Sequence, residues 1–275
     1  METKNFYWAY LSILREQKGC KVATMKFAAK AIAGIRYLVN FLRKRDERSR
    51  YILAEALSRQ IYPKYKFSEF GRLIEYDEDF IRYYEQFCGT DNYHSLDRKY
   101  TLDQLLKLVT TVAGDTVECG AYKGASSYLI CRRIVGLDKT HHVFDSFEGL
   151  SMPGPEDGTH WTEGGMAVNE AILMENLRGF DFVVCHRGWI PERFDDVKDK
   201  RFCFVHLDVD LYQPTRDALI FFYPRTNPGG IILCDDYGFV TCPGAKTAMD
   251  SFFSNKSEEV VLLPTGQGVV IKKSI

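Results

Sequence analysis

A strand is predicted to turn into a helix at residues 117–127, which read Val117-Glu118-Cys119-Gly120-Ala121-Tyr122-Lys123-Gly124-Ala125-Ser126-Ser127. The β-branched and apolar residues before Gly120 favour a strand, and the run after Gly124 favours a helix. Glycine at these two positions allows a tight turn and lets a ligand approach the backbone closely. The same pattern also occurs as a plain strand-to-helix connection, so its meaning depends on the rest of the chain.

The pattern repeats from Thr101 onward, where short β-branched runs alternate with helical runs. Strands are predicted at 116–119, 142–145, 182–185, 202–208 and 230–234, and helices at 125–135, 167–177, 191–196, 214–223 and 244–253. The tail predicts two more strands, 260–263 and 268–272, joined as a hairpin. Alternating β-α units are typical of a parallel sheet. We therefore predict an α/β fold: a doubly wound, mostly parallel, seven-stranded sheet with a C-terminal β-hairpin.

The composition excludes several classes of protein. With 275 residues, 45% of them hydrophobic and 27% charged, the chain is neither disordered nor collagen-like. No apolar run approaches the ~20 residues that a membrane span needs, and the N-terminus lacks the pattern of a secretory signal. None of the eight cysteines forms a Cys-x-x-Cys pair, so we expect reduced thiols rather than disulfides or a zinc site. These features predict a cytoplasmic protein.

Positive charge gathers near the N-terminus. Residues 21–50 hold nine basic and two acidic side chains, a local charge of +7, so the rest of the chain carries −8 of the total of −1. Apolar residues recur there at spacings of three and four, at Phe27, Ala31, Ile35, Leu38 and Leu42. This indicates an amphipathic helix that packs on its own domain or a second copy, or contacts an anionic membrane or an acidic partner. We predict a helical extension over 1–100 and the α/β domain over 101–275.

A second motif, at the end of the second predicted strand, points to a nucleoside ligand. Asp145 follows the glycine turn by about 25 residues, where α/β nucleoside sites place an acid for the ribose hydroxyls. A helix or turn cap is the alternative role for Asp145. Glu118 can accept hydrogen bonds from a cationic or hydroxylated group. The turn lacks the G-x-G-x-x-G and Walker A patterns, and an acid inside it would repel a pyrophosphate.

Carboxylates follow two strands that are neighbours in a doubly wound sheet. The two stretches read His206-Leu207-Asp208-Val209-Asp210-Leu211-Tyr212 and Leu233-Cys234-Asp235-Asp236-Tyr237. Strand alternation predicts that Asp208 and Asp210 point to the same side. Four clustered carboxylates repel one another, so either some are protonated or a cation lies among them. Hard oxygen ligands suit Mg²⁺, Mn²⁺ or Ca²⁺. In the alternative, Asp235 and Asp236 cap a turn and Asp208 pairs with a basic residue.

Taken together, the motifs resemble the macrocin O-methyltransferase family over about residues 109–272. They are Glu118 with Gly120, the run Asp145-Ser146-Phe147-Glu148-Gly149-Leu150, the run Arg187-Gly188-Trp189-Ile190-Pro191, the run from His206 to Tyr212, and Asp235-Asp236-Tyr237-Gly238. The family includes enzymes that methylate sugar hydroxyls of antibiotics. The resemblance implies a class I S-adenosylmethionine fold, divalent-metal-dependent O-methylation, a homodimer and an N-terminal helical extension.

The resemblance also implies roles for single residues. The donor would be bound by Glu118, Gly120, Tyr122, Gly124, Ser126, Asp145, Ser146, Gly188, Trp189 and Asp208. Within this set, Glu118 and Gly120 would line the methionine moiety, Asp145 would hold the ribose, and Gly188 with Trp189 would border adenine. Mg²⁺ or Mn²⁺ would be bound by Asp208, Asp235 and Asp236. Tyr122 replaces the usual middle glycine of the turn.

The chemistry of methyl transfer agrees with these residues. A sulfonium donor gives up its methyl group in line to a hydroxyl oxygen, which must be oriented and must lose its proton. A metal that binds vicinal hydroxyls orients the oxygen and lowers its pKa, and Asp210 or Asp208 accepts the proton. The glycine-flanked loop 150–165 is predicted to be a lid, and its His160 is a second candidate base.

We therefore predict an S-adenosylmethionine- and divalent-metal-dependent O-methyltransferase acting on a hydroxyl of a sugar or glycosylated metabolite. A nicotinamide-dependent oxidoreductase is an alternative, but it requires a phosphate-binding glycine loop and a Tyr-x-x-x-Lys pair that do not appear where needed. A non-enzymatic, metal-stabilised adaptor at a membrane surface, using residues 21–50, is a second alternative. The catalytic half shows no basic groove for nucleic acid. The identity of the acceptor stays open.

Overall fold

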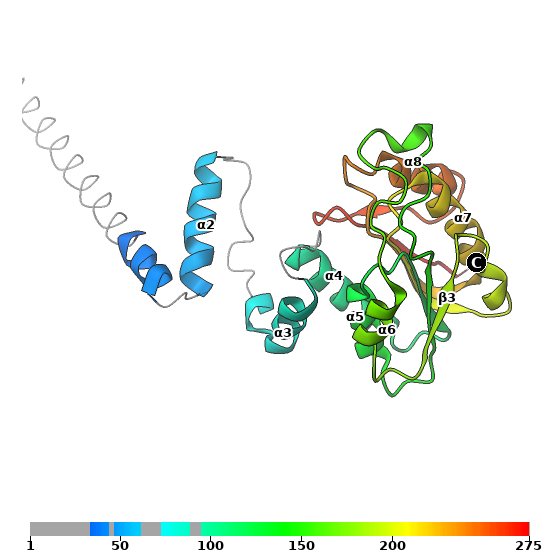
Figure 1. Cartoon of the computed structure of the whole chain (residues 1–275), viewed down its shortest axis with the longest axis horizontal. Helices are drawn as coiled ribbons and strands as arrows, with labels where there is room; N and C mark the ends of the chain where they lie inside the picture. Colours follow the sequence, from blue (N-terminus) through cyan, green and yellow to red (C-terminus); the bar gives the residue numbers. More distant parts are fainter. Residues whose placement is uncertain (1–33, 44–46, 62–72, 89–94, 275) are drawn as a thin grey trace, which may run out of the picture. The chain divides into compact units, whose positions relative to one another are not determined.

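A computed structural model describes residues 34–43, 47–61, 73–88 and 95–274 (Figure 1). The chain divides into two compact units, Met1–Leu73 and Ile74–Ile275. In the first unit, residues 34–43 and helix α2 (Glu47–Ile61) are helical, as predicted, and the remainder of the predicted helix lies outside the described residues. No described helix combines the length and apolar character that crossing a bilayer requires.

The second unit is built on one seven-stranded sheet with the strand order β3-β2-β1-β4-β5-β7-β6. Its strands are β1 (Asp115–Cys119), β2 (His141–Asp145), β3 (Val183–Arg187), β4 (Phe202–Leu207), β5 (Thr226–Cys234), β6 (Val261–Leu262) and β7 (Gly268–Ile271). Strands β1 to β5 are parallel, and β7 pairs antiparallel with both β5 and β6. The predicted fold class and C-terminal hairpin are confirmed.

Helices cover both faces of this sheet (Figure 1). They are α3 (Glu78–Phe87), α4 (Leu96–Leu106), α5 (Ala125–Ile134), α6 (Glu170–Asn176), α7 (Tyr212–Phe222) and α8 (Pro243–Phe253). Five short 3₁₀ turns complete the described elements: η1 (Leu73–Tyr76), η2 (Lys107–Val109), η3 (Pro155–Asp157), η4 (Phe194–Val197) and η5 (Tyr223–Arg225).

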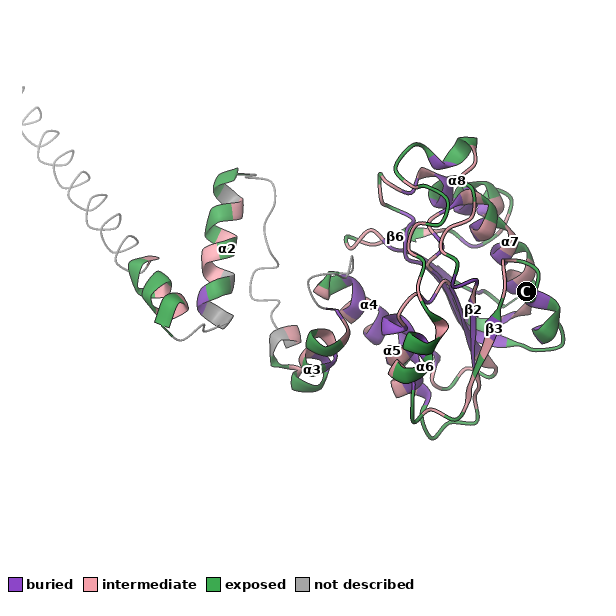
Figure 2. Ribbon diagram, viewed as in Figure 1, coloured by how far each residue is buried: buried purple, intermediate pink, exposed green. Residues whose placement is uncertain are grey.

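Strand alternation sends neighbouring side chains to opposite faces of the sheet, where they join different apolar clusters. Ile232 of β5 packs in a cluster with residues of α7 and α8, whereas Leu233 packs in a cluster with residues of α3, α4 and α5. Burial is accordingly concentrated in the sheet and in the helix faces that cover it (Figure 2). Because both faces are buried, the strands read as nearly continuous apolar runs.

Helix α4 belongs to the sheet unit. Its Leu102 and Leu106 are fully buried in the same cluster as Leu129 and Ile130 of α5. The sequence pattern predicts that the α/β domain starts at residue 101, whereas the structure divides the chain before Ile74. The periodicity of α4 is concealed because Arg98, Lys99 and Asp103 are buried beside its leucines.

Candidate active site

A cavity of about 670 Å³ lies at the carboxyl ends of the parallel strands. The strand order reverses direction between β1 and β4, which is where open α/β sheets bind their ligands. The cavity is lined by most of the residues that the sequence predicts for the site: Gly120, Tyr122, Ser126, Asp145, Ser146, His160, Gly188, Trp189, Asp208, Asp210 and Asp236. The predicted residues are therefore brought together from five strand ends and the loop 150–165.

Three predicted residues, Glu118, Gly124 and Asp235, are not among those lining the cavity. Glu118 is fully buried in β1, where its Oε1 lies 2.8 Å from His206 Nδ1 and its other oxygen accepts the Ser127 hydroxyl. It precedes the strand end, so its side chain packs in the interior beneath the site. Gly124 has a φ of +87° and begins α5.

Asp145 ties the glycine turn to the end of β2. Its Oδ2 accepts the backbone N–H groups of Ala121 (2.8 Å) and Tyr122 (3.0 Å), and its Oδ1 accepts that of Phe147 (2.7 Å). A carboxylate offers about four lone-pair sites, so these bonds leave room for one more donor. Gly120, with a φ of +80°, is required because a Cβ there would clash with the carbonyl oxygen of Asp208.

The two carboxylates that follow β4, Asp208 and Asp210, are not related by strand alternation as the sequence predicted. Strand β4 ends at Leu207, and Asp210 has a φ of +58°, so alternation does not relate Asp208 to Asp210. The prediction that they share a side by alternation is therefore wrong, although both line the cavity. The turn brings the Asp210 N–H to within 3.0 Å of Asp236 Oδ2.

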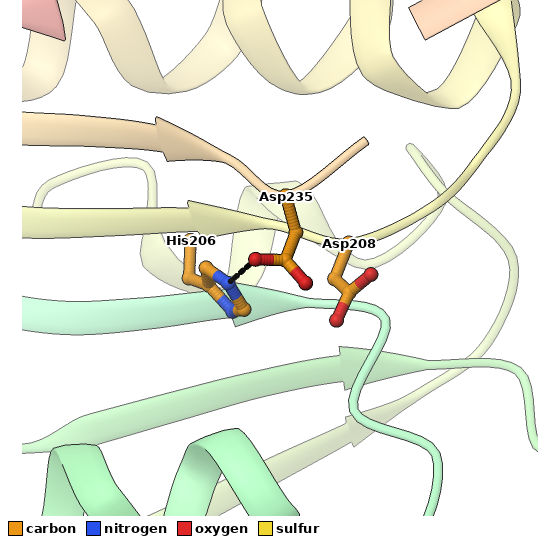
Figure 3. Close-up of side chains that lie close together, drawn as sticks. All are labelled: His206, Asp208 and Asp235. Atoms are coloured by element: carbon orange, nitrogen blue, oxygen red, sulfur yellow. Dashed lines mark ion pairs between the residues drawn. The ribbon is translucent and has the colours of Figure 1, made fainter. Parts of the chain in front are cut away.

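The four carboxylates fall into two groups. Asp208 and Asp235 gather with His206, as Figure 3 shows, and Asp210 and Asp236 gather with Cys242. Within each group the candidate ligand atoms lie within 4.8 Å of one another. The predicted set of Asp208, Asp235 and Asp236 is thus divided between two adjoining clusters.

A buried arginine that the sequence analysis missed lies against these acids. Arg98 of α4 is 8% exposed, and its Nη2 lies 2.5 Å from Asp235 Oδ2 and 3.9 Å from Asp236 Oδ1. Its guanidinium also stacks over the Phe239 ring at 4.3 Å. The only sequence signal was a pair of adjacent cations, Arg98 and Lys99, beside the apolar positions of a helix. The Arg98 guanidinium therefore supplies part of the positive charge that the sequence predicted among these carboxylates.

The surroundings of the four aspartates give their carboxyl groups different pKa values. Burial opposes the ionisation of Asp235, but the positive charges of Arg98 and Lys99 hold its pKa well below the usual range. Burial and the Asp235 charge raise the pKa of Asp208 to about 7. Burial raises the pKa of Asp210 to about 6. Burial and the charges of Asp210 and Asp208 raise the pKa of Asp236 well above its usual value.

This arrangement has two chemical capabilities. A carboxyl group whose pKa is near neutrality can take up a proton from a reacting hydroxyl. Three crowded carboxyl groups with raised pKa values would also be stabilised by a cation among them, and their hard oxygens suit Mg²⁺ or Mn²⁺. The residues present therefore fit a divalent cation.

The loop 150–165 covers one side of the cavity and is tied to the unit at several points. At its base, Leu150 N–H donates to Gly165 O (2.7 Å) and Gly164 N–H donates to Leu150 O (2.8 Å). Near its middle, the buried Asp157 accepts the Tyr212 N–H at the start of α7 (2.6 Å). Its His160 lines the cavity. The loop is thus held over the site by its own hydrogen bonds.

Comparisons with known proteins show which family the chain resembles. The Macrocin-O-methyltransferase (TylF) family profile matches residues 95–261. Demethyldecarbamoylnovobiocin O-methyltransferase of Streptomyces niveus is 32% identical over 156 residues, which are 51% of this chain and 58% of that protein. A tetracenomycin-type 4'-O-methyltransferase of Streptomyces olivaceus, which acts on a dimethoxy-rhamnosyl compound by its name, is 31% identical over 173 residues, 55% of this chain and 66% of that protein. These matches therefore span about three fifths of each relative.

Solved structures of methyltransferases share the fold of this chain. The O-methyltransferase NovP is 26% identical, with a TM-score of 0.54 over 66% of this chain and 84% of that chain. The calicheamicin methyltransferase CalS11, 18% identical with a TM-score of 0.58 over 74% of this chain and 94% of that chain, has the same fold. The family profile covers more than half of the chain, including every strand up to the first residue of β6. The chain belongs to the macrocin O-methyltransferase family.

Proposed function

We propose that this protein transfers a methyl group from S-adenosylmethionine to a hydroxyl of a sugar or glycosylated metabolite, with Mg²⁺ or Mn²⁺ bound at the carboxylates. The observation that carries the proposal is one cavity that joins the glycine turn and Asp145 to the carboxylates Asp208, Asp210 and Asp236. The relatives named above are O-methyltransferases, and one acts on a rhamnosyl compound by its name. These points favour the proposal over an oxidoreductase or an adaptor.

The donor half of the cavity would bind the nucleoside of S-adenosylmethionine. Asp145 has a lone-pair site left for a ribose hydroxyl, and Ser146 lies beside it. Gly188 and Trp189 would border the adenine, since both line the wall after β3. Gly120 allows the donor to approach the backbone. Glu118 and Gly124 would act by supporting the turn from behind.

Tyr122 of the turn and Ser126 of α5 also line the cavity and complete the predicted donor set. The Asp208 carbonyl oxygen lies against Gly120 of the turn, and the Asp208 carboxyl group gathers with Asp235, which supports its assignment to both sets. The donor supplies an electrophilic methyl group on a sulfonium. The chain supplies the position of that methyl group relative to the acceptor oxygen.

Asp208, Asp235 and Asp236 would hold the divalent cation. Burial and neighbouring negative charges raise the pKa values of Asp208 and Asp236, and a bound cation would relieve the repulsion between these charges. Asp235 would add a third oxygen ligand, and Arg98 already balances the charge of its carboxylate. When bound, the cation would hold vicinal hydroxyls and lower the pKa of the hydroxyl that reacts.

Asp210 would accept the proton of the reacting hydroxyl, with Asp208 and His160 as further candidate bases. Asp210 lines the cavity, and burial brings its pKa to about 6, close to the range in which a general base is efficient. The loop 150–165 would exclude water during transfer.

Beyond the site, we propose a cytoplasmic homodimer that touches a membrane surface through residues 21–50. The dimer is what the family resemblance implies. The seven cysteines in the described residues are free thiols, as is usual in a reducing compartment. The local charge of +7 and the exposed Ile35, Leu38 and Leu42 support a peripheral contact with anionic lipid.

Calorimetric titration with S-adenosylhomocysteine, with and without Mg²⁺, tests the proposal. We expect micromolar binding, about −8 kcal/mol, that Asp145→Ala abolishes. The matched control is Asp250→Ala, because Asp250 pairs with Lys246 on α8 and does not line the cavity. Absence of binding in wild-type protein under both conditions would overturn the donor assignment. Formation of S-adenosylhomocysteine with a panel of rhamnosides, measured by mass spectrometry, then tests the acceptor class.

A further inference from the structure

Hydrogen bonds link Trp161 of the loop 150–165, through Cys242, to the candidate base Asp210. Trp161 Nε1–H donates to Cys242 Sγ at 3.4 Å, and the Cys242 thiol donates to Asp210 Oδ1 at 3.4 Å. They come from the loop, the residue preceding α8, and the turn after β4. All three line the cavity.

The direction of both hydrogen bonds follows from the groups involved. An indole nitrogen can only donate, so the sulfur must accept from Trp161. A carboxylate oxygen accepts, and the Cys242 thiol is placed to donate to Asp210 Oδ1. Cysteine can fill both roles at once because it has one S–H and sulfur lone pairs.

Asp210 is constrained on both its backbone and its side chain. Its φ of +58° is unfavourable for a residue with a Cβ, and the bond from its N–H to Asp236 Oδ2 helps to hold it. Cys242 engages Oδ1, which leaves Oδ2 to receive a proton. Because a thiol is a weak donor, it can orient the carboxylate without the strong bond that a hydroxyl would form.

We propose that Cys242 is a positioning residue that orients the Asp210 carboxylate and couples it to the seating of Trp161. The base would then be aligned when the loop covers the cavity, and it would lose its alignment when the loop leaves. This inference rests on the proposed function, because it gives Asp210 the role of base. The competing role for Cys242 is that of a ligand for a soft metal, since its sulfur lies within 4.8 Å of oxygens of Asp210 and Asp236.

Nuclear magnetic resonance of the full chain, labelled with ¹⁵N-tryptophan, can detect this coupling. The chain has three tryptophans, so Trp161→Phe identifies the Trp161 indole signal. When Cys242 is present, we expect Asp210→Asn to shift the Trp161 indole signal. In a Cys242→Ala background, we expect Asp210→Asn to leave that signal unchanged. We expect Cys242→Ala itself to raise the solvent exchange of the indole proton about tenfold, as loss of one hydrogen bond permits. Cys242→Ser should restore the coupling, because a hydroxyl also accepts and donates.

Control samples separate this coupling from a general packing effect and from a metal site. Cys185→Ala should leave the Trp161 signal unchanged, because Cys185 lies in β3 and does not line the cavity. If Asp210→Asn shifts the signal equally with and without the thiol, or if Cys242→Ser behaves as Cys242→Ala, the inference is wrong. Micromolar Cd²⁺ binding that Cys242→Ser removes would also overturn it in favour of a metal ligand. Titration of the same samples with S-adenosylhomocysteine distinguishes failure of the proposed function, which would appear as absent binding in wild-type protein.

Discussion

At the scale of single residues, the balance of charge in the carboxylate cluster is decided by one arginine. Arg98 contacts Asp235 directly and reaches Asp236 only at 3.9 Å, so it compensates one carboxylate and leaves the others crowded. Breaking a buried ion pair leaves an uncompensated charge and costs several kcal/mol, which makes Asp235 a poor first target for mutation. Asp236 is better suited because its raised pKa means that a neutral side chain is tolerated there.

Asp236→Asn is therefore expected to weaken divalent-cation binding while preserving the fold. The amide oxygen can still accept the Asp210 N–H, but the variant lacks the charge that attracts the cation. We expect Mn²⁺ affinity, measured by electron paramagnetic resonance, to fall at least about tenfold, equivalent to about 1.4 kcal/mol. Affinity for S-adenosylhomocysteine should be nearly unchanged, and Asp250→Asn is the matched control. An equal loss of both affinities would mean that the carboxylate cluster belongs to the donor site.

A second residue-scale prediction concerns stability in acid. Asp115 at the start of β1 accepts the Thr140 N–H at 2.9 Å, and it lies 3.3 Å from His142 Nε2 and 3.4 Å from Lys200 Nζ. Burial raises its pKa, but the His142 and Thr140 hydrogen bonds and the Lys200 charge outweigh burial and lower it to about 2. The folded pKa is below the unfolded one, so this stabilisation is present above about pH 4 and is lost as the pH falls to about 2.

Asp115→Asn should remove that stabilisation at neutral pH. We expect the free energy of unfolding in urea to fall by about 1–2 kcal/mol at pH 7, allowing for solvent screening, and by only about a third as much at pH 2.5, where part of the stabilisation is already lost. Asp138→Asn, in the exposed turn after α5, is the control. A loss that is the same at both pH values would show that Asp115 acts by packing rather than by charge.

At the scale of elements, apolar periodicity identified the strands of the sheet unit and most of its helices, because each buries one face, or both, in an apolar cluster. It did not identify α4, where charged residues are buried beside the leucines. Apolar periodicity says less about how residues 34–43 pack, because the apolar side chains described there are largely exposed. Residues 34–43 place Ile35, Leu38 and Leu42 on one side at spacings of three and four, with exposed fractions of 61, 46 and 69%. Arg36, Asn40 and Arg43 follow a similar spacing on another side. This is the pattern of a helix that lies in a lipid interface.

Vesicle flotation of the full chain tests that contact. We expect the protein to float with phosphatidylglycerol vesicles, to float poorly with phosphatidylcholine, and to be released by 0.5 M salt at a Debye length of about 4 Å. Leu42→Glu should reduce binding about tenfold or more, because burying a leucine contributes about 1.5–3 kcal/mol. Leu57→Glu in α2, where Leu57 is 62% exposed, is the control. Loss of dimer mass in solution with Leu42→Glu, without any vesicle binding by wild-type protein, would assign the face to a second copy instead.

At the scale of the whole molecule, the total charge of −1 conceals a division between a cationic N-terminal segment and an acidic remainder. The boundary between the two compact units does not coincide with the boundary between the cationic segment and the acidic remainder. Helices α3 and α4 carry Phe80 and Leu102 into the core that also contains Leu129 and Phe204. The sheet unit therefore begins well before the first β-α unit of the sequence.

Two truncated chains distinguish the possible boundaries. A chain of residues 74–275 should fold and bind S-adenosylhomocysteine with an affinity within about threefold of the full chain, a difference of less than about 1 kcal/mol. A chain of residues 101–275 lacks Phe80 and Arg98 and should unfold at much lower urea concentration. Circular dichroism in urea and calorimetry measure both properties. Equal stability of the two chains would return the boundary to residue 101.

The sequence by itself determined the sheet, its terminal hairpin and the family, and it named most of the residues that line the cavity. These features depend on the hydrophobic period and on the residues that follow strand ends. Only the tertiary structure decided which charges meet. Arg98 and Asp235 are 137 positions apart, and the interior position of Glu118 depends on where β1 ends relative to its neighbours. The division of four aspartates into two groups depends on a backbone turn at Asp210 that alternation does not foresee. Local patterns specify elements through burial, whereas electrostatic partners are set by the distances that folding creates.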